Sequence, residues 1–272
     1  MNWIFLRIFA NEIKLHNTMN YPTNLTDNQW SQIEKYFPNG SRKRKHALRD
    51  IINAIFYLNK TGCQWCMIPN DFPSWNSVYY YFCKWKRDGT FDLIMRMLHK
   101  EVRVQAGRGP EPSVYIIDSR SVHTSHHTDN VKGIDGNKHI KGRKEHIAVD
   151  TLGFPIGMAV HEANVYDAIG AELVLEDMDG RSERLHTILA DGGYRGERLK
   201  SAAKAKGWDL KVVLRPEESP KKFTVIPLRW IVERSFSWLE NFRRLSIDHE
   251  FLAESSLAMI QLAFIKLLLN RL

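Results

Sequence analysis

The sequence is poor in cysteine, and it contains no long hydrophobic run and no internal repeat. Three cysteines (Cys63, Cys66 and Cys83) in 272 residues are too few for the disulfide framework of a secreted domain, so a reducing cytoplasm fits best. Cys63 and Cys66 have the spacing of a zinc half-site or a redox pair, but no second Cys/His pair of comparable spacing lies near them. We therefore expect small buried thiols rather than a zinc or redox centre.

Neither end of the chain reads as a membrane segment. The first ten residues are apolar but are interrupted by Arg7, and they are too short to span a bilayer. Met19 begins a cleaner polar segment, so residues 1–18 are an uninformative extension, and the sequence leaves open whether Met19 is the true start. Residues 251–272 are apolar with helical spacing yet carry Glu254 and Lys266, which predicts an amphipathic helix packed on the core.

Acidic residues are outnumbered. The chain has 39 Lys+Arg against 31 Asp+Glu, a net charge of +8. Polyanions are the expected partners of such a protein, because phosphates release counterions when they are neutralised. Two basic runs would contact phosphates rather than bases, although a solvated charged loop is the alternative for the second run. Their members are Arg42, Lys43, Arg44 and Lys45, and then Lys138, Lys141, Arg143 and Lys144.

The chain divides into two parts by pattern. Residues 19–106 predict short helices with tight turns, near 25–37, 48–58, 78–87 and 91–105, which suit a helix-turn-helix-like module. The Gly- and Pro-rich residues 107–112 form the linker. Residues 113–272 predict a mixed α/β sheet flanked by helices. Its strands are expected at 114–118, 145–150, 155–160, 187–190 and 210–214, and its helices at 168–176, 197–206, 228–243 and 255–269.

Three acidic residues stand where local sequence aims them at one site. Asp118 and Asp191 each close an apolar, β-branched run, and Glu233 lies on a strongly apolar predicted helix. Two carboxylates at strand ends and one on a helix can form an oxygen-rich site for hard divalent cations. Each acid alone has a plainer reading, as a turn residue or an ion-pair partner. Histidines 123, 126, 127 and 139 lack a nearby carboxylate or cysteine partner, so we expect surface groups and no zinc.

The same residues carry a resemblance to a known family. The segments Tyr115-Ile-Ile-Asp118-Ser, Ala190-Asp191-Gly-Gly-Tyr194 and Arg229-Trp-Ile-Val-Glu233-Arg-Ser-Phe resemble the signatures of bacterial insertion-sequence transposases of the insertion-sequence-five group. Other segments are similar to that group's amino-terminal and middle regions, and the likeness covers roughly residues 20–250. They are Leu25-Thr-Asp-x-Gln-Trp30, Gly62-Cys-Gln-Trp65-x-x-x-Pro69, Lys141-Gly-Arg-Lys-x-His146 and Ala163-Asn164-Val-Tyr-Asp167.

The resemblance implies an Asp-Asp-Glu transposase with a ribonuclease-H-like catalytic domain at 113–272 and a DNA-end-binding domain at 19–106. Asp118, Asp191 and Glu233 would be catalytic and hold two Mg²⁺ or Mn²⁺ ions. The implied partner is double-stranded DNA, at element ends and at the target. We expect homo-oligomers on DNA in the bacterial cytoplasm, associated with the nucleoid, and no membrane partner.

The sequence also departs from the family's pattern. Arg229 matches the signature arginine, but the expected aromatic before it is Ile226 and the expected basic residue after Glu233 is Glu240. Arg243 or Arg244 is the nearest basic substitute. Arg229, Arg243 and Arg244 are expected to contact DNA, although contacts with the donor DNA end are expected to differ from those of the family. Two alternatives to transposition stay open: a metal-dependent DNA nuclease of the same fold without strand transfer, and a catalytically idle DNA-binding regulator.

Overall fold

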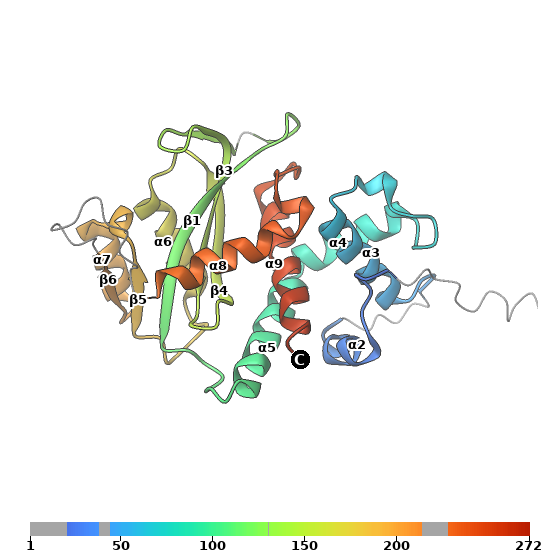
Figure 1. The fold of residues 1–272 in the computed structure, drawn as a ribbon, viewed down its shortest axis with the longest axis horizontal. Coiled ribbons are helices and arrows are strands. Elements are labelled where there is room, and N and C mark those ends of the chain that lie inside the picture. The colour runs from blue at the N-terminus through green and yellow to red at the C-terminus, as the bar shows by residue number, and fades with distance from the viewer. Residues whose placement is uncertain (1–20, 38–43, 130, 214–227) are drawn as a thin grey trace, which may run out of the picture.

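The computed structural model describes residues 21–37, 44–129, 131–213 and 228–272, and Figure 1 shows their arrangement. Arg42, Lys43 and Ile226, and the extension at 1–18, lie outside the described residues. The first part of the described chain is all helical, as predicted. Its helices are α2 (Asp27–Ile33), α3 (Leu48–Thr61), α4 (Trp75–Arg87) and α5 (Thr90–Gln105), with 3₁₀-helices at Glu34–Tyr36 and Trp65–Met67.

Local sequence explains where these helices begin and end. The Thr26 hydroxyl accepts from the Gln29 backbone N–H and the Gln29 side chain accepts from the Thr26 N–H, a capping box that starts α2. Helix α3 ends at Gly62, which adopts a left-handed φ of 74°. A Cβ at Gly62 would lie 3.1 Å from the Arg243 Cβ, so the glycine also permits close packing against the last part of the chain.

The second part contains a mixed sheet in the order β2-β3-β1-β5-β6, with β4 paired to β3. Strand β1 runs antiparallel to β3 and parallel to β5. This arrangement confirms the predicted mixed α/β sheet with flanking helices, which is ribonuclease-H-like. The strands are β1 (Val114–His123), β2 (Gly133–Asp135), β3 (Ile140–Val149), β4 (Pro155–Glu162), β5 (Thr187–Ala190) and β6 (Asp209–Val212).

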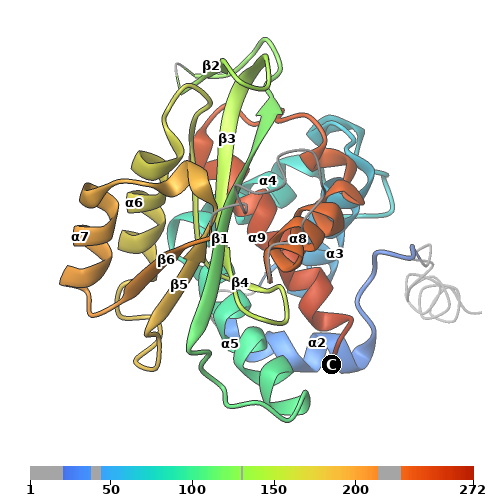
Figure 2. The same cartoon turned by 60° about the vertical axis from the view of Figure 1, so that its left-hand side comes forward.

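Helices cover both faces of the sheet (Figure 2). Helices α6 (Asp167–Met178) and α7 (Glu197–Ala205) pack on one face, where Tyr115, Ile117 and Ile188 point. Helices α8 (Arg229–Glu240) and α9 (Ala253–Leu269) lie on the other face, toward which Ile116 and Leu189 point. Successive residues of a strand therefore serve different cores.

Helix α9 joins the two parts of the chain. It contacts α3, α4 and α5 as well as β4 and α8, and its buried side chains share one hydrophobic core with the amino-terminal helices. This explains why the helix is apolar on most of its circumference. Among the described residues, none of the helices is both long enough and apolar enough to cross a bilayer.

Several expectations are wrong in detail. Strand β1 continues past Asp118 to His123, and β3 begins at Ile140, so the basic segment at 138–144, for which no strand was predicted, is largely strand. Pairing of residues 120–123 with 142–145 supplies backbone hydrogen bonds that local sequence does not reveal. The helix expected at 228–243 ends at Glu240. Cys66 is exposed rather than buried, and Cys63 is half-buried.

Candidate active site

The register between β1 and β5 places the two aspartates side by side. Val114 pairs with Thr187 and Ile116 with Leu189, a step of 73 positions along the chain, and the same step leads from Asp118 to Asp191. Side-chain alternation points both aspartates toward the α8 face, as it does Ile116 and Leu189. Asp118 thus lies within β1 rather than at its end, whereas Asp191 directly follows β5.

Helix α8 supplies the third acid and an arginine between all three. The Arg229 Nη2 atom lies 3.3 Å from Asp191 Oδ2 and 3.8 Å from Asp118 Oδ2. The Arg229 Nε atom lies 3.3 Å from Glu233 Oε1, one helical turn later. The structure therefore brings the three predicted acids around one guanidinium group, with Glu233 the most exposed of them at 59% of its side chain.

Asp118 is the most buried of the three acids, and its electrostatics reflect this. Burial raises the pKa of Asp118 to about 6, although the Ser119 backbone N–H and Arg229 oppose the rise and the Asp191 charge adds to it. Asp191 caps the 3₁₀-helix η3 (Gly192–Tyr194), because its Oδ1 accepts from the Gly193 N–H at 2.8 Å.

The donor atoms suit a hard divalent cation. Within the described residues, no three acidic, histidine or cysteine side chains are arranged to hold a metal ion as they stand. The three carboxylates instead share the positive charge of Arg229, so the site already attracts a cation. All three side-chain ligands would be carboxylate oxygens, which Mg²⁺ and Mn²⁺ prefer. The residues therefore fit such ions in charge and donor type.

A polar layer lies behind these acids, on the α6 face of the sheet. Only the segment from Asn164 to Asp167 in the sequence hinted at it. Asp167, the first residue of α6, accepts from Ser119 Oγ at 3.0 Å and from Lys144 Nζ at 2.9 Å. Tyr194 is buried beside this layer. Burial raises its pKa well above the ordinary value, and the charges of Asp118, Asp167 and Asp191 add to the rise.

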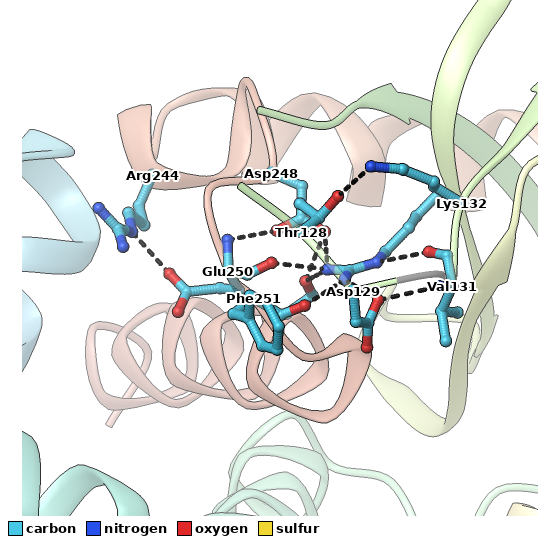
Figure 3. Close-up of polar contacts among 10 residues, drawn as sticks. Thr128, Asp129, Val131, Lys132, Arg244, Asp248, Glu250 and Phe251 are labelled. Carbon is cyan, nitrogen blue, oxygen red and sulfur yellow. Dashed lines mark hydrogen bonds and ion pairs between the residues drawn. The ribbon is translucent and has the colours of Figure 1, made fainter. Parts of the chain in front are cut away.

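The predicted phosphate-binding residues separate into exposed and buried groups. Lys45, Lys138, Lys141 and Arg243 are exposed, and Arg44 is half-buried. Three others are buried and ion-paired, so in this structure their charges are neutralised within the protein and do not face solvent. Arg143 pairs with Asp129 and Asp248, Lys144 with Asp167, and Arg244 with Glu250; Figure 3 shows the contacts around Asp248 and Glu250.

Comparison with known proteins identifies the family. Residues 109–268 match the family described as "Transposase DDE domain", and residues 25–95 match "Putative transposase of IS4/5 family". The chain belongs to the DDE transposase family. It is 33% identical over 133 residues to the "Putative transposase for insertion sequence element IS402" of Burkholderia cepacia. That alignment covers 46% of this chain and 60% of the relative.

The family match agrees with the sheet topology and with the resemblance predicted from the sequence. The DDE match begins within the Gly- and Pro-rich segment at 107–112 and includes strands β1 to β6 and helices α6 to α8. The match to the IS4/5 family covers the amino-terminal helices up to Met95 in α5. Residues 96–108 lie between the two matches, and the hydrophobic core shared with α9 packs both parts of the chain together.

Proposed function

We propose that this chain is a transposase that binds terminal inverted repeats and catalyses DNA cleavage and strand transfer. The observation that carries the proposal is the convergence of Asp118, Asp191 and Glu233 on Arg229. These acids come from two neighbouring strands of a ribonuclease-H-like sheet and from one helix that packs on it. No covalent protein–DNA intermediate is required, so neither Tyr115 nor Tyr194 is assigned as a nucleophile, and both are fully buried.

Each acid has a distinct task in this proposal. Asp118 and Asp191 hold one divalent cation, Mg²⁺ or Mn²⁺, and Asp118 with Glu233 holds a second. Such ions, when bound, lower the pKa of an attacking water and stabilise charge on the oxygens exchanged in phosphodiester chemistry. The raised pKa of Asp118 favours its neutral form below about pH 6, so the carboxylate is best able to bind a cation above that pH.

Arg229 links this site to DNA. Its guanidinium is a planar donor suited to phosphate, and it lies among the acids at the start of α8. A phosphate of the DNA end offers it an alternative partner once cations neutralise the carboxylates. Exposed Lys45, Lys138, Lys141 and Arg243 supply further phosphate contacts, which give affinity and salt dependence rather than base selection.

The larger assembly is part of the same proposal. Residues 19–106 bind the element ends, residues 107–112 connect the parts, and residues 113–272 carry out the chemistry, with two or more copies acting on DNA in the bacterial cytoplasm. The exposed aromatic residues Trp75, Tyr79 and Tyr80 lie on α4 in the end-binding part.

The test uses purified protein, labelled element-end DNA and Mg²⁺. Wild type should nick the end and join it to target DNA, and Asp191→Ala should abolish both reactions while keeping end binding. Asp209→Ala is the control, because Asp209 is an exposed aspartate on neighbouring β6 whose side chain forms an ion pair only with Lys211 among the described residues. Nicking without joining favours a nuclease, and binding without nicking by wild type favours the idle regulator. An active Asp191→Ala variant rejects the site.

A further inference from the structure

Asp167 connects the two strand-derived aspartates from behind the sheet. Its Oδ1 accepts from the hydroxyl of Ser119, the residue next to Asp118 on β1. On its other side it adjoins the turn that follows Asp191. A Cβ placed on Gly193 would lie 3.3 Å from Asp167 Oδ2 and 3.1 Å from Asp191 Oδ1, so there is no spare room between the two carboxylates.

Asp167 does not share the face of the sheet used by the acids. Side chains alternate along β1, so Asp118 points toward α8 while Ser119 points toward α6, where Asp167 accepts its hydrogen bond. Asp167 therefore acts on the site through its neighbours rather than as a ligand. Lys144, buried on β3, donates to Asp167 Oδ1 at 2.9 Å and to the Val165 carbonyl at 2.8 Å, which fixes the carboxylate from a third direction.

Burial lowers the pKa of both histidines beside this carboxylate, His146 and His161, and so favours the neutral form of each ring. The His161 Nδ1 atom faces the Glu162 carbonyl at 2.9 Å and must donate to it, because a carbonyl only accepts. The His161 Nε2 atom then accepts from His146 Nδ1 at 2.8 Å, which leaves His146 Nε2 with a lone pair. Burial, with the nearby charge of Lys144 contributing, holds the pKa of His146 well below its ordinary value.

This layer therefore contains one balanced ion pair, Lys144 with Asp167, and two buried polar atoms without a partner of good geometry among the described residues. They are His146 Nε2, 3.7 Å from Asp167 Oδ1, and the Tyr194 hydroxyl. The Tyr194 ring packs edge-on against the His146 ring, with centroids 5.8 Å apart. Tyr194 belongs to η3, so the turn after Asp191 rests directly on the layer that Asp167 organises.

We propose that Asp167 is a positioning residue that fixes the separation of Asp118 and Asp191 by tying β1, β3 and the η3 turn together behind the sheet. This inference rests on the proposed function, in which those two aspartates hold a cation. Groups that orient metal ligands in this way commonly change metal affinity about 10- to 100-fold when they are removed. Asp167 thus supports the proposed metal site from behind the sheet and is not itself a fourth ligand.

The decisive variant replaces the ion pair as a unit. Asp167→Asn alone would leave the buried Lys144 charge without a partner and would confuse stability with positioning. Asp167→Ala combined with Lys144→Met leaves no buried charge in the layer and also removes the oxygen that accepts from the Ser119 hydroxyl. Mn²⁺ binding to DNA-free protein is measured from the loss of the free-ion electron paramagnetic resonance signal, alongside thermal unfolding and end-DNA binding in EDTA. The double variant should stay folded and keep its DNA affinity but bind Mn²⁺ about tenfold more weakly.

Two conservative serine variants test the positioning role of Asp167 independently, and they provide the test if the double variant does not fold. Ser119→Ala removes the hydroxyl that reaches Asp167, and Ser121→Ala removes a matched hydroxyl on the same strand, which donates to Asp135 at 2.5 Å. Ser119→Ala should weaken Mn²⁺ binding about threefold and Ser121→Ala should leave it unchanged.

The outcomes separate this inference from the function on which it rests. If the folded double variant binds Mn²⁺ like wild type, or if both serine variants behave alike, Asp167 serves only to neutralise Lys144 and the inference is overturned. If wild type itself fails to bind Mn²⁺, the proposed cation site fails, and the positioning role fails with it.

Discussion

Arg143 was predicted from the sequence to bind phosphate, but the structure assigns it a structural role that mutation can test. The side chain is fully buried on β3. Its guanidinium lies between the loop after β1 and the segment before α9, and it uses all three nitrogens as donors. The acceptors are Val131 O, Asp129 Oδ1, Phe251 O, Asp248 Oδ2, Glu250 O and Ser256 Oγ, at 2.7 to 3.0 Å, several of which are labelled in Figure 3.

Arg143→Met should therefore destabilise the protein strongly. The change keeps an apolar side chain of similar length but leaves Asp129 and Asp248 without their cation. The Val131 and Glu250 carbonyls lose the Arg143 donor, whereas the Phe251 carbonyl still accepts from the Asp129 N–H. Breaking a buried, hydrogen-bonded ion pair by removing one partner costs about 3–5 kcal/mol. A chain of this size loses about 2–4 °C of melting temperature per kcal/mol, so the midpoint should fall by about 10 °C.

The matched control is Lys141→Met, two residues earlier on the same strand with an exposed side chain. Its stability should stay within about 0.5 kcal/mol of wild type, while DNA affinity falls and the salt dependence of binding becomes shallower by about one unit of slope. Thermal unfolding by circular dichroism and DNA titrations at several salt concentrations measure both quantities. If Arg143→Met melts like wild type and loses DNA affinity as Lys141→Met does, the reasoning from burial is refuted.

Three further predictions follow from other contacts. Arg229→Gln removes the cation that the three acids share, so DNA-free protein should bind Mn²⁺ about fivefold tighter, given about 1 kcal/mol for partly exposed ion pairs; weaker binding in a titration would contradict this. Burial alone would raise the pKa of Asp150, but hydrogen bonding and charge from His99, among other contacts, lower it, so the carboxylate stabilises the fold above its unfolded pKa of about 3.9. The stability gap between wild type and Asp150→Asn in urea should thus narrow as pH falls below about 4, and a constant gap would count against the assignment. Gly62→Ala should cost about 1 kcal/mol more than Gly89→Ala, because both have positive φ but only Gly62 approaches Arg243; equal losses in urea unfolding would show that backbone strain alone acts.

The sequence predicts short elements well where pattern and boundary signals agree. The strand at 187–190 is confirmed at both ends, because a β-branched run is followed by Asp191 and two glycines. The helix ending at Gly62 is similarly marked by its left-handed cap. The strand predicted at 145–150 begins later than the observed β3, because the charged first half of β3 resembles a solvent-exposed segment in the sequence. Its charges are neutralised by Asp167 and Asp248, which are distant in sequence, and no local pattern reveals such partners.

The position of the three acids depends on both local sequence and contacts between segments that are distant in the chain. Local sequence singles out Asp118, Asp191 and Glu233, but only the parallel register makes the first two neighbours, and their assignment as metal ligands stays a prediction. The arginine at the centre of the acids was expected to contact DNA; its contact with all three carboxylates needs the packing of α8 on β1. Asp167 appeared in the sequence only as part of a matching motif, with no indication of its link to Ser119.

Side-chain alternation along β1 explains why one strand can serve both the site and its support. Odd-numbered Ser119 and Ser121 bond to Asp167 and Asp135, whereas even-numbered Asp118 and Arg120 face α8, where Arg120 pairs with Glu145. A carboxylate cluster must be held rigidly against its own repulsion, and hydrogen bonds on the acids' own face would compete with cations for the same oxygens. Hydrogen bonds to the adjacent residue, on the opposite face, avoid that competition. Strand β1 therefore carries the proposed metal ligand Asp118 and the supporting Ser119 one residue apart.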